Sequence, residues 1–300
     1  MAKYLAGGRV RGTLHGITYQ RNLYTGWVAK EKSTLTAEQI ATSPAFQRTR
    51  ENNNEMKGVG AYVKELRKSL DLFLPFVSDP IVTGRLIRSV KAIQTKEPGQ
   101  RGQRPIVGAN IANGLVAEGF EVSEPYPIAR AARALSVEVG ERTKEGNVTK
   151  QAIQFISDSV IFPTGANCAL PIVTIIECDE LEYADGAYNW FNGNTNNNIK
   201  RNVLSDSIVL RDRPKSEYEI IVPNGDSVIV AGDWDHVGSF NFGSNFVIPQ
   251  YEFGRNLVWF GLQFGQLVDE STQDANVYRF YPLRGATAGK AVATLDPLKP

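Results

Sequence analysis

The segment EPGQRGQRP, residues 97–105, separates two parts of the sequence that differ in periodicity. Before it, apolar residues recur at helical spacing, and after it they gather in short β-prone runs. Two prolines and two glycines within this short stretch are typical of a turn or linker. We therefore place a domain boundary here, with residues 1–104 on one side and residues 105–300 on the other.

The beginning of the first part carries signals for a small antiparallel sheet. The runs GITYQR and WVAKEK are β-prone and enclose the turn-forming NLYTG, and VRGTLH before them supplies a third strand. Three short strands bury little apolar area alone, so we expect them to pack against something else. Thr36 and Gln39 follow with the spacing of a capping box.

Residues 44–95 carry the pattern of a helical hairpin. Ser43-Pro44 and Asp79-Pro80 each place a capping residue before a proline, as at the start of a helix. Apolar residues at helical spacing follow both starts, at Val59, Val63, Leu66, Leu70 and Phe73 and at Val82, Leu86, Val90 and Ile93. The three asparagines at 52–54 predict a helix end or kink before Gly58, or else a recognition face together with Arg48 and Arg50.

The second part is dominated by strand-like runs. ALSVEVGE and VTKQAIQF flank a hairpin turn at 145–147, and further runs are VTIIECDELEY, SIVLRD, YEIIVP, DSVIVAG, NLVWFGLQFGQLV, VYRFYPL and AVATL. The asparagine-rich YNWFNGNTNNNIKRN between them predicts a loop. About nine strands over about 170 residues favour a sandwich or jelly roll. We therefore expect an α+β protein, with a β-hairpin and a helical hairpin in residues 1–104 and an all-β sandwich or jelly-roll-like domain in residues 105–300.

The two cysteines argue against a disulfide. Cys168 and Cys178 lie in one apolar run, and extended chain at ~3.3 Å per residue would hold them ~33 Å apart if Pro171 leaves the strand intact.

The N-terminal MAKYLAGGRVRG lacks the apolar core of a signal peptide, and no run approaches the ~20 apolar residues that span a bilayer. We expect buried thiols in a cytoplasmic protein without a membrane partner, unless export uses another signal.

The net charge of +1 conceals an uneven distribution. Residues 1–104 contain 18 Lys or Arg and 8 Asp or Glu, whereas residues 105–300 contain 15 and 24, so the two parts carry +10 and −9. Chance and solvated faces are one explanation. The other is that the basic part attracts a polyanion, the acidic part of another copy, or the acidic part of its own chain.

Motifs for catalysis or cofactor binding are missing from the sequence. It contains no nucleophile elbow, Walker loop, zinc-protease helix or EF-hand loop. His236 follows Asp233 and Asp235, but this spacing is not a ligand pattern, and His15 before Gly16 fits a turn. An acidic strand end explains the carboxylates of ECDELEYAD as well as a glycosidase pair does. We therefore expect a protein that is not an enzyme and that has no cofactor or metal.

Aromatic residues are concentrated between Phe240 and Phe264. They could form a platform that stacks on sugars or bases, with Trp190 as a further candidate. In NLVWFGLQF, however, alternation gives a strand that is apolar on both faces, with Val258, Phe260, Leu262 and Phe264 on one and Leu257 and Trp259 on the other. Such a strand is covered twice, and we favour a core strand over a binding platform.

The order of these segments resembles a family of uncharacterised bacterial proteins. The shared order is GTLHGITYQRN and GWVAKEK, then SPAFQRTREN, a helical pair, RGQR, a β-domain, and a closing LVWFGLQFGQLV and YPLRGATAGKAVATL. The likeness is densest in residues 8–104 and 256–295, and PAFQRTREN is its more specific motif. The resemblance implies a cytoplasmic protein in two parts and brings no catalytic residue or cofactor.

Three functions fit these observations. The first is a structural protein that assembles with itself into a filament, tube or shell, through head-to-tail contacts between the basic N-terminal part and the acidic β-domain. A phage-derived tube, sheath or capsid component would be one version. The expected contact residues are Arg48, Arg50, Arg101 and Arg104 with Glu177, Asp179, Glu180 and Glu182.

The two other functions use different surfaces. Nucleic-acid binding would place the Lys and Arg residues of 1–104 on phosphates, with little reading of the bases. A carbohydrate-binding sandwich would use Trp190 or the aromatic residues between 240 and 264.

Overall fold

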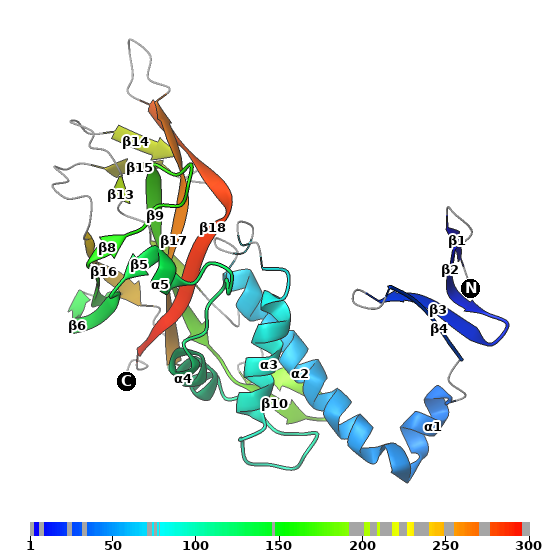
Figure 1. Cartoon of the computed structure of the whole chain (residues 1–300). Coiled ribbons are helices and arrows are strands. Elements are labelled where there is room, and N and C mark those ends of the chain that lie inside the picture. Colours follow the sequence, from blue (N-terminus) through cyan, green and yellow to red (C-terminus); the bar gives the residue numbers. More distant parts are fainter. Residues whose placement is uncertain are drawn as a thin grey trace. The chain divides into compact units, whose positions relative to one another are not determined.

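A computed structural model gives the fold of the 300-residue chain (Figure 1). The structure describes residues 3–5, 9–22, 26–31, 35–70, 74, 77, 79–145, 148–191, 201–204, 209–210, 218–221, 227–230, 240–248, 255–269 and 277–295. Helices combine with several antiparallel sheets, which confirms the α+β class. The chain divides into the compact units Met1–Asn52 and Asn53–Pro300.

The N-terminal unit begins with a four-stranded sheet. Its strands are β1 (Lys3–Leu5), β2 (Arg9–Leu14), β3 (Ile17–Asn22) and β4 (Gly26–Glu31). They pair as antiparallel neighbours in chain order, which confirms the predicted hairpin and third strand and adds β1. His15 and Gly16 form the turn between β2 and β3, with φ of 48° and 77°. Positive φ at both central residues matches the twist of paired strands in a type I′ turn.

Two short helices and the start of a long one follow. They are α1 (Ala37–Thr42), the 3-10 helix η1 (Pro44–Phe46) and α2 (Gln47–Ser69), which continues into the second unit. Thr36 and Gln39 form the predicted capping box. The prediction of a helix end at residues 52–54 is wrong, because α2 runs through them. Burial of Val59, Val63 and Leu66 on this helix outweighs the low helix propensity of asparagine.

Three more helices belong to the second unit: α3 (Val82–Gln94), α4 (Gly108–Glu118) and α5 (Ile128–Ala131). The sequence predicts the pair α2–α3 but not α4, because GANIANGLVAE is rich in weak helix formers. Two of its glycines allow close packing. A Cβ on Gly108 would lie 2.1 Å from the Cys178 carbonyl oxygen, and one on Gly114 would lie 2.5 Å from Ile93. Tertiary contacts therefore require the residues that weaken α4 as an isolated helix.

The main sheet of the second unit has the order β12-β9-β17-β18-β14-β15, and β13 also pairs with β9. The bounds are β9 (Cys168–Cys178), β12 (Arg201–Leu204), β13 (Val209–Leu210), β14 (Tyr218–Ile221), β15 (Ser227–Val230), β17 (Arg255–Asp269) and β18 (Val277–Leu295). Pro171 does not interrupt β9, because the pairing with β17 continues through this position, where Pro171 lies opposite Leu262.

Smaller sheets complete the unit. A three-stranded sheet has the order β16-β7-β6, β5 pairs with β8, and β10 pairs with β11. The bounds are β5 (Ala132–Arg133), β6 (Ser136–Glu145), β7 (Val148–Ser157), β8 (Ser159–Val160), β10 (Leu181–Ala184), β11 (Ala187–Trp190) and β16 (Phe240–Ile248). Pairing of Glu145 with Val148 confirms the predicted hairpin. The expected loop at 188–202 is shorter, because β11 contains residues 188–190 and β12 begins at 201, with 192–200 outside the described residues.

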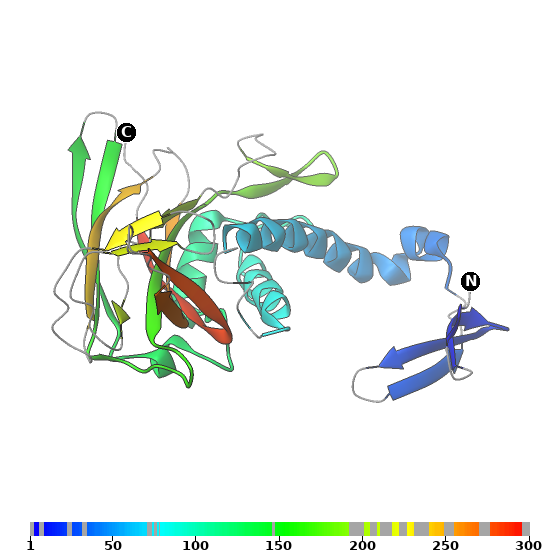
Figure 2. The ribbon, with the colours of Figure 1, turned by 90° about the horizontal axis from the view of Figure 1, so that it is seen from above.

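Helices cover one face of the main sheet, and the three-stranded sheet covers the other (Figure 2). On the helix side, side chains of α2, α3 and α4 pack with Ile176 and Trp259. On the opposite side, Phe155 of β7 stacks on Phe260 with 4.5 Å between ring centroids. Strand β17 therefore lies between two cores, which confirms the prediction of a strand covered twice. Residues 53–104 belong to the second unit because their helices share a core with its strands.

Candidate functional site

The two faces of the N-terminal sheet differ in polarity, and one of them is largely apolar. The pairing register of β2, β3 and β4 places these residues on the largely apolar face: Leu14, Ile17, Tyr19, Trp27 and Ala29, with the charged Arg21 and Glu31 at positions opposite Trp27 and Ile17. The opposite face carries Thr13, Thr18, Gln20, Lys30 and Val28. The Thr13 and Thr18 hydroxyls are hydrogen-bonded across this polar face at 3.0 Å. The sheet therefore has the alternation of a strand layer with one face turned toward a core.

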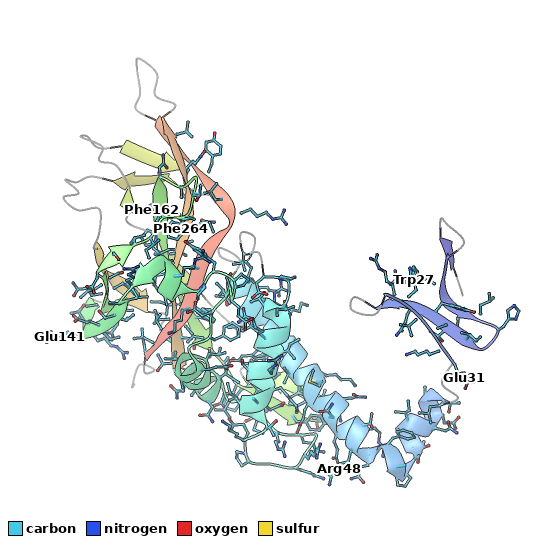
Figure 3. The ribbon with its side chains drawn as sticks, in the orientation of Figure 1. Trp27, Glu31, Arg48, Glu141, Phe162 and Phe264 are labelled. Carbon is cyan, nitrogen blue, oxygen red and sulfur yellow. The ribbon has the colours of Figure 1, made fainter. Side chains whose placement is uncertain are left out.

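The side chains of this sheet whose burial is described are exposed or half-buried. Among residues 11–21 and 26–31, no side chain is buried. Ile17 and Trp27 are each 37% exposed, and Figure 3 labels Trp27 on β4. A small sheet needs a covered apolar face for stability, and an uncovered one marks an interaction surface. The apolar face defined by Leu14, Ile17, Tyr19, Trp27 and Ala29 is therefore the first candidate site.

Two predicted contact residues, Arg48 and Arg50, lie near the start of α2. The Arg50 guanidinium donates hydrogen bonds of 2.8 Å to the backbone oxygens of Ile40 and Ser43, so it holds the corner between α1 and α2. Arg48 pairs with Glu51 at 2.9 Å, and its side chain is 71% exposed (Figure 3). Arg48 remains accessible to a partner, whereas Arg50 has a structural role.

Arg104 belongs to an ionic network around Glu55. The buried Glu55 carboxylate accepts hydrogen bonds from Lys91 and from the Gly102 N–H, at 2.8 Å for the latter, and Arg104 lies 3.5 Å away. Burial alone would raise the pKa of Glu55. The bonds from Lys91 and Gly102 and the charges of Lys91 and Arg104 outweigh it, so the pKa lies below its usual value. This network joins α2 to α3 and to the predicted linker, where Arg101 is exposed.

The linker also contacts the β10–β11 hairpin within the same chain. Ile106 and Leu181 exchange backbone hydrogen bonds of 2.8 and 3.0 Å. The Arg104 carbonyl accepts hydrogen bonds from Tyr188 of β11 at 2.9 Å and from Gln94 of α3 at 3.0 Å. Hydrogen bonds to backbone groups therefore join the linker to the β10–β11 hairpin within one molecule.

The four predicted acidic contact residues differ in accessibility. Glu177 is half-buried and Asp179 is buried, whereas Glu180 is half-buried and Glu182 is exposed. Burial raises the pKa of Glu180, and the charges of Glu182, Asp179 and Glu97 raise it further. Within the described residues, no group of three or more His, Cys, Asp or Glu side chains is arranged to hold a metal ion. The accessible negative charge is concentrated on Glu180 and Glu182.

Sequence reasoning missed the β10–β11 hairpin that carries these two carboxylates. Its turn consists of Asp185 and Gly186, with φ of 53° and 82°. Asp-Gly is a preferred pair for such a turn, but the asparagine-rich run after it led us to expect a loop.

The hairpin packs on α2 through Trp190, whose ring stacks on Tyr62 with centroids 5.5 Å apart. Trp190, a predicted carbohydrate contact, is therefore half-buried in this stack.

The aromatic residues of β17 form a core and not a binding platform. Trp259, Phe260 and Phe264 are fully buried. Phe264 packs edge-on against Phe162 with ring centroids 5.6 Å apart, and both are labelled in Figure 3. Strand β16 contains Phe240, Phe242 and Phe246, while Tyr251 and Phe253 lie outside the described residues. The residues favoured as core are thus confirmed as core in β17.

The cysteines are free and buried at the two ends of β9. Burial raises the pKa of both thiols, that of Cys178 to about 12, so neither is a thiolate at neutral pH. This confirms the prediction of ordinary buried thiols. His15 lies in the β2–β3 turn as expected, whereas His236, Asp233 and Asp235 lie outside the described residues.

None of the described helices has both the length and the apolar character needed to cross a bilayer. Comparison of the chain with protein-family models, with curated proteins and with solved structures finds no match. The resemblance to a family of uncharacterised bacterial proteins stays a prediction. Function is therefore argued from the surfaces of this chain alone.

Proposed function

We propose that this is a structural protein that assembles with copies of itself into a filament, tube or shell. The observation that carries the proposal is the N-terminal sheet, which has an apolar face but no buried side chain where burial is described. Full burial of a large apolar side chain contributes about 1.5–3 kcal/mol. Covering the exposed parts of Leu14, Ile17, Tyr19 and Trp27 would therefore supply several kcal/mol to an association.

Charge supports a second copy as the cover. The unit Met1–Asn52 contains 8 Lys or Arg and 3 Asp or Glu, and the unit Asn53–Pro300 contains 25 and 29. A positive module on one copy is attracted to a negative body on the next. Contacts between two different surfaces propagate into open assemblies unless their rotation closes a ring. Within this proposal, the packed sheets of residues 105–300 are a sandwich-like body, and Arg48 supplies charge at the contact.

The test is the mass of the nuclease-treated full-length protein by light scattering at low and high salt, with negative-stain images of the same samples. Ile17→Lys with Trp27→Lys places two charges on the apolar face and should reduce large particles to the 33.1 kDa monomer. Thr18→Lys with Gln20→Lys adds the same charge to the polar face and should leave the particles intact. A wild-type protein that remains a monomer in both conditions would overturn the proposal.

Nucleic-acid binding is the second candidate. It is favoured by exposed basic residues on α2 and α3, namely Lys57, Lys64, Arg67, Lys68 and Arg88. Phosphate contacts of this kind weaken steeply with salt, and the −9 charge of residues 105–300 opposes them. Full-length protein that fails to retain DNA or RNA at low salt would exclude this function.

A further inference from the structure

A groove lies between α2 and α3 in the second unit. It has a volume of about 610 Å³, within the range of about 300–1,000 Å³ that is usual for ligand sites. Residues 60–68 of α2 line one side, and Thr83 and Ile87 of α3 line the other. Val63, Leu74 and Ile87 give it an aliphatic floor that is continuous with the core on the helix side of the main sheet.

The charge around this groove is positive. Lys64, Arg67 and Lys68 line it, and no described lining residue is acidic. The Lys68 ammonium group pairs with the Glu65 carboxylate at 2.7 Å. The Lys68 side chain is 61% exposed. A Cβ on Gly60 would meet nothing within 4 Å, so the groove is open at this point. An aliphatic floor below a cationic rim fits a partner that is both apolar and acidic.

The β10–β11 hairpin presents a surface of that chemistry. Its pairing register and alternation place four residues on the face that points away from α2: Glu180, Glu182, Asn189 and Phe191. The Phe191 N–H donates to the Glu180 carbonyl at 3.0 Å, so the aromatic ring and the carboxylate come from adjacent positions. Phe191 is 52% exposed. We call these four residues the acidic face of the hairpin.

The groove and the acidic face cannot meet within one molecule, because they lie on opposite sides of α2. The hairpin contacts α2 at Gly58, where an added Cβ would be 2.9 Å from the Tyr188 ring, and at Tyr62. Successive helical residues turn by about 100°, so Lys64 and Arg67 lie about 240° and 180° around the helix from Gly58. Two complementary surfaces on opposite sides of a rigid element suit a head-to-tail contact.

We infer that the groove binds the acidic face of the β10–β11 hairpin of a second copy. Phe191 lies over the aliphatic floor, and Glu180 and Glu182 lie against Lys64 and Arg67. This inference rests on the proposed self-assembly and adds a contact that is separate from the N-terminal sheet. A phosphodiester chain fits the groove less well, because none of its described lining residues is aromatic and bases therefore have nothing to stack on.

Two proteins with one new cysteine each test the contact directly. Lys64→Cys mixed with Glu182→Cys should give a disulfide-linked heterodimer under copper–phenanthroline oxidation, identified on a non-reducing gel and by peptide mapping. The native Cys168 and Cys178 are buried and do not compete. Arg133→Cys, at an exposed position outside the groove, is the control partner for Glu182→Cys. A yield no higher than that of the control pair would overturn the inference.

Exchange of charges separates this contact from a loss of folding. Lys64→Glu with Arg67→Glu, and Glu180→Lys with Glu182→Lys, each reverse one side and should weaken association at least about tenfold. An equimolar mixture should recover association, because each variant again meets an opposite charge. Arg133→Glu with Arg284→Glu changes charge at exposed positions outside the groove and should associate like the wild type. A mixture that associates no better than its components would contradict the contact.

These outcomes distinguish the contact from self-assembly in general. If both charge variants form the same particles as the wild type, the groove contact is excluded and self-assembly by another contact is supported. A wild-type monomer at every concentration would remove both. Retention of a DNA oligonucleotide that is lost in Lys64→Glu with Arg67→Glu would assign the groove to phosphate and overturn the inference.

Discussion

The N-terminal sheet and the main sheet differ in what covers them. In the main sheet, β17 has apolar residues on both faces, helices cover one face and a second sheet covers the other. In the N-terminal sheet, one face is largely apolar but also carries Arg21 and Glu31, and no side chain with described burial is buried. Alternation in the sequence therefore tells how many faces of a strand need a cover, but it does not tell which molecule provides it.

Truncation of one large aromatic residue in each sheet tests this comparison most strongly. Phe260→Ala removes a fully buried ring that stacks on Phe155 and should lower the free energy of unfolding by about 3–5 kcal/mol. Trp27→Ala should cost less than about 1 kcal/mol in a dilute monomer, because its ring already contacts water. Chemical denaturation measures both values. Equal losses would show that the chain itself covers the N-terminal sheet.

Replacement of Glu55 tests how much its buried, ionised carboxylate stabilises the second unit. Glu55→Gln removes a buried charge that accepts hydrogen bonds from Lys91 and Gly102, so we expect a loss of about 1.5–3 kcal/mol at neutral pH. Folding lowers the pKa of this carboxyl from 4.5, so its stabilising effect is complete above pH 4.5 and disappears as pH falls through the folded-state pKa.

The difference in unfolding free energy between wild type and Glu55→Gln should therefore narrow on acidification below pH 4.5. Glu138→Gln at an exposed position of β6 is the matched control variant. A difference that stays constant down to low pH would contradict the role of the ionised Glu55.

Two glycines of α2 distinguish its covered and open sides. Gly60→Ala should raise stability by about 0.5–1 kcal/mol, because alanine favours the helix and the site is open. Gly58→Ala should instead lower it by about 1–3 kcal/mol, because the new Cβ would press on the Tyr188 ring. Thermal unfolding compares the two variants directly. A stabilised Gly58→Ala variant would mean that the hairpin does not pack on α2.

Neutralisation of Glu180 should have the smallest effect on the fold. Folding raises the pKa of this carboxyl through burial and neighbouring carboxylates, so its charge weakens the native state as pH rises through that pKa. Glu180→Gln should therefore raise the melting temperature slightly at neutral pH while it weakens association. Calorimetry and light scattering on the same samples measure both quantities. A lower melting temperature would show that the charge of Glu180 stabilises the monomer.

Much of the local structure could be predicted from the sequence. The capping box at Thr36, the helical hairpin and the hairpin turn at His15 depend on residues a few positions apart. The same holds for the buried thiols of β9 and the two-sided burial of β17, since a strand periodicity of two decides which residues share a face. The predicted contact residues differ in their surroundings: Glu180 and Glu182 are accessible, whereas Arg50 and Arg104 bond to nearby groups, and their role in a contact stays a prediction.

By itself the sequence determined the N-terminal strands, the helices α2 and α3 and the two apolar faces of β17, because these properties follow from local periodicity. Only the tertiary structure decided that the units divide at Asn52, that α4 forms from a glycine-rich segment, and that the groove and the acidic face lie on opposite sides of α2. These features depend on contacts between segments far apart in the chain. Charge and composition indicate which residues are exposed to solvent. Which segments pack together is determined by the core that they share.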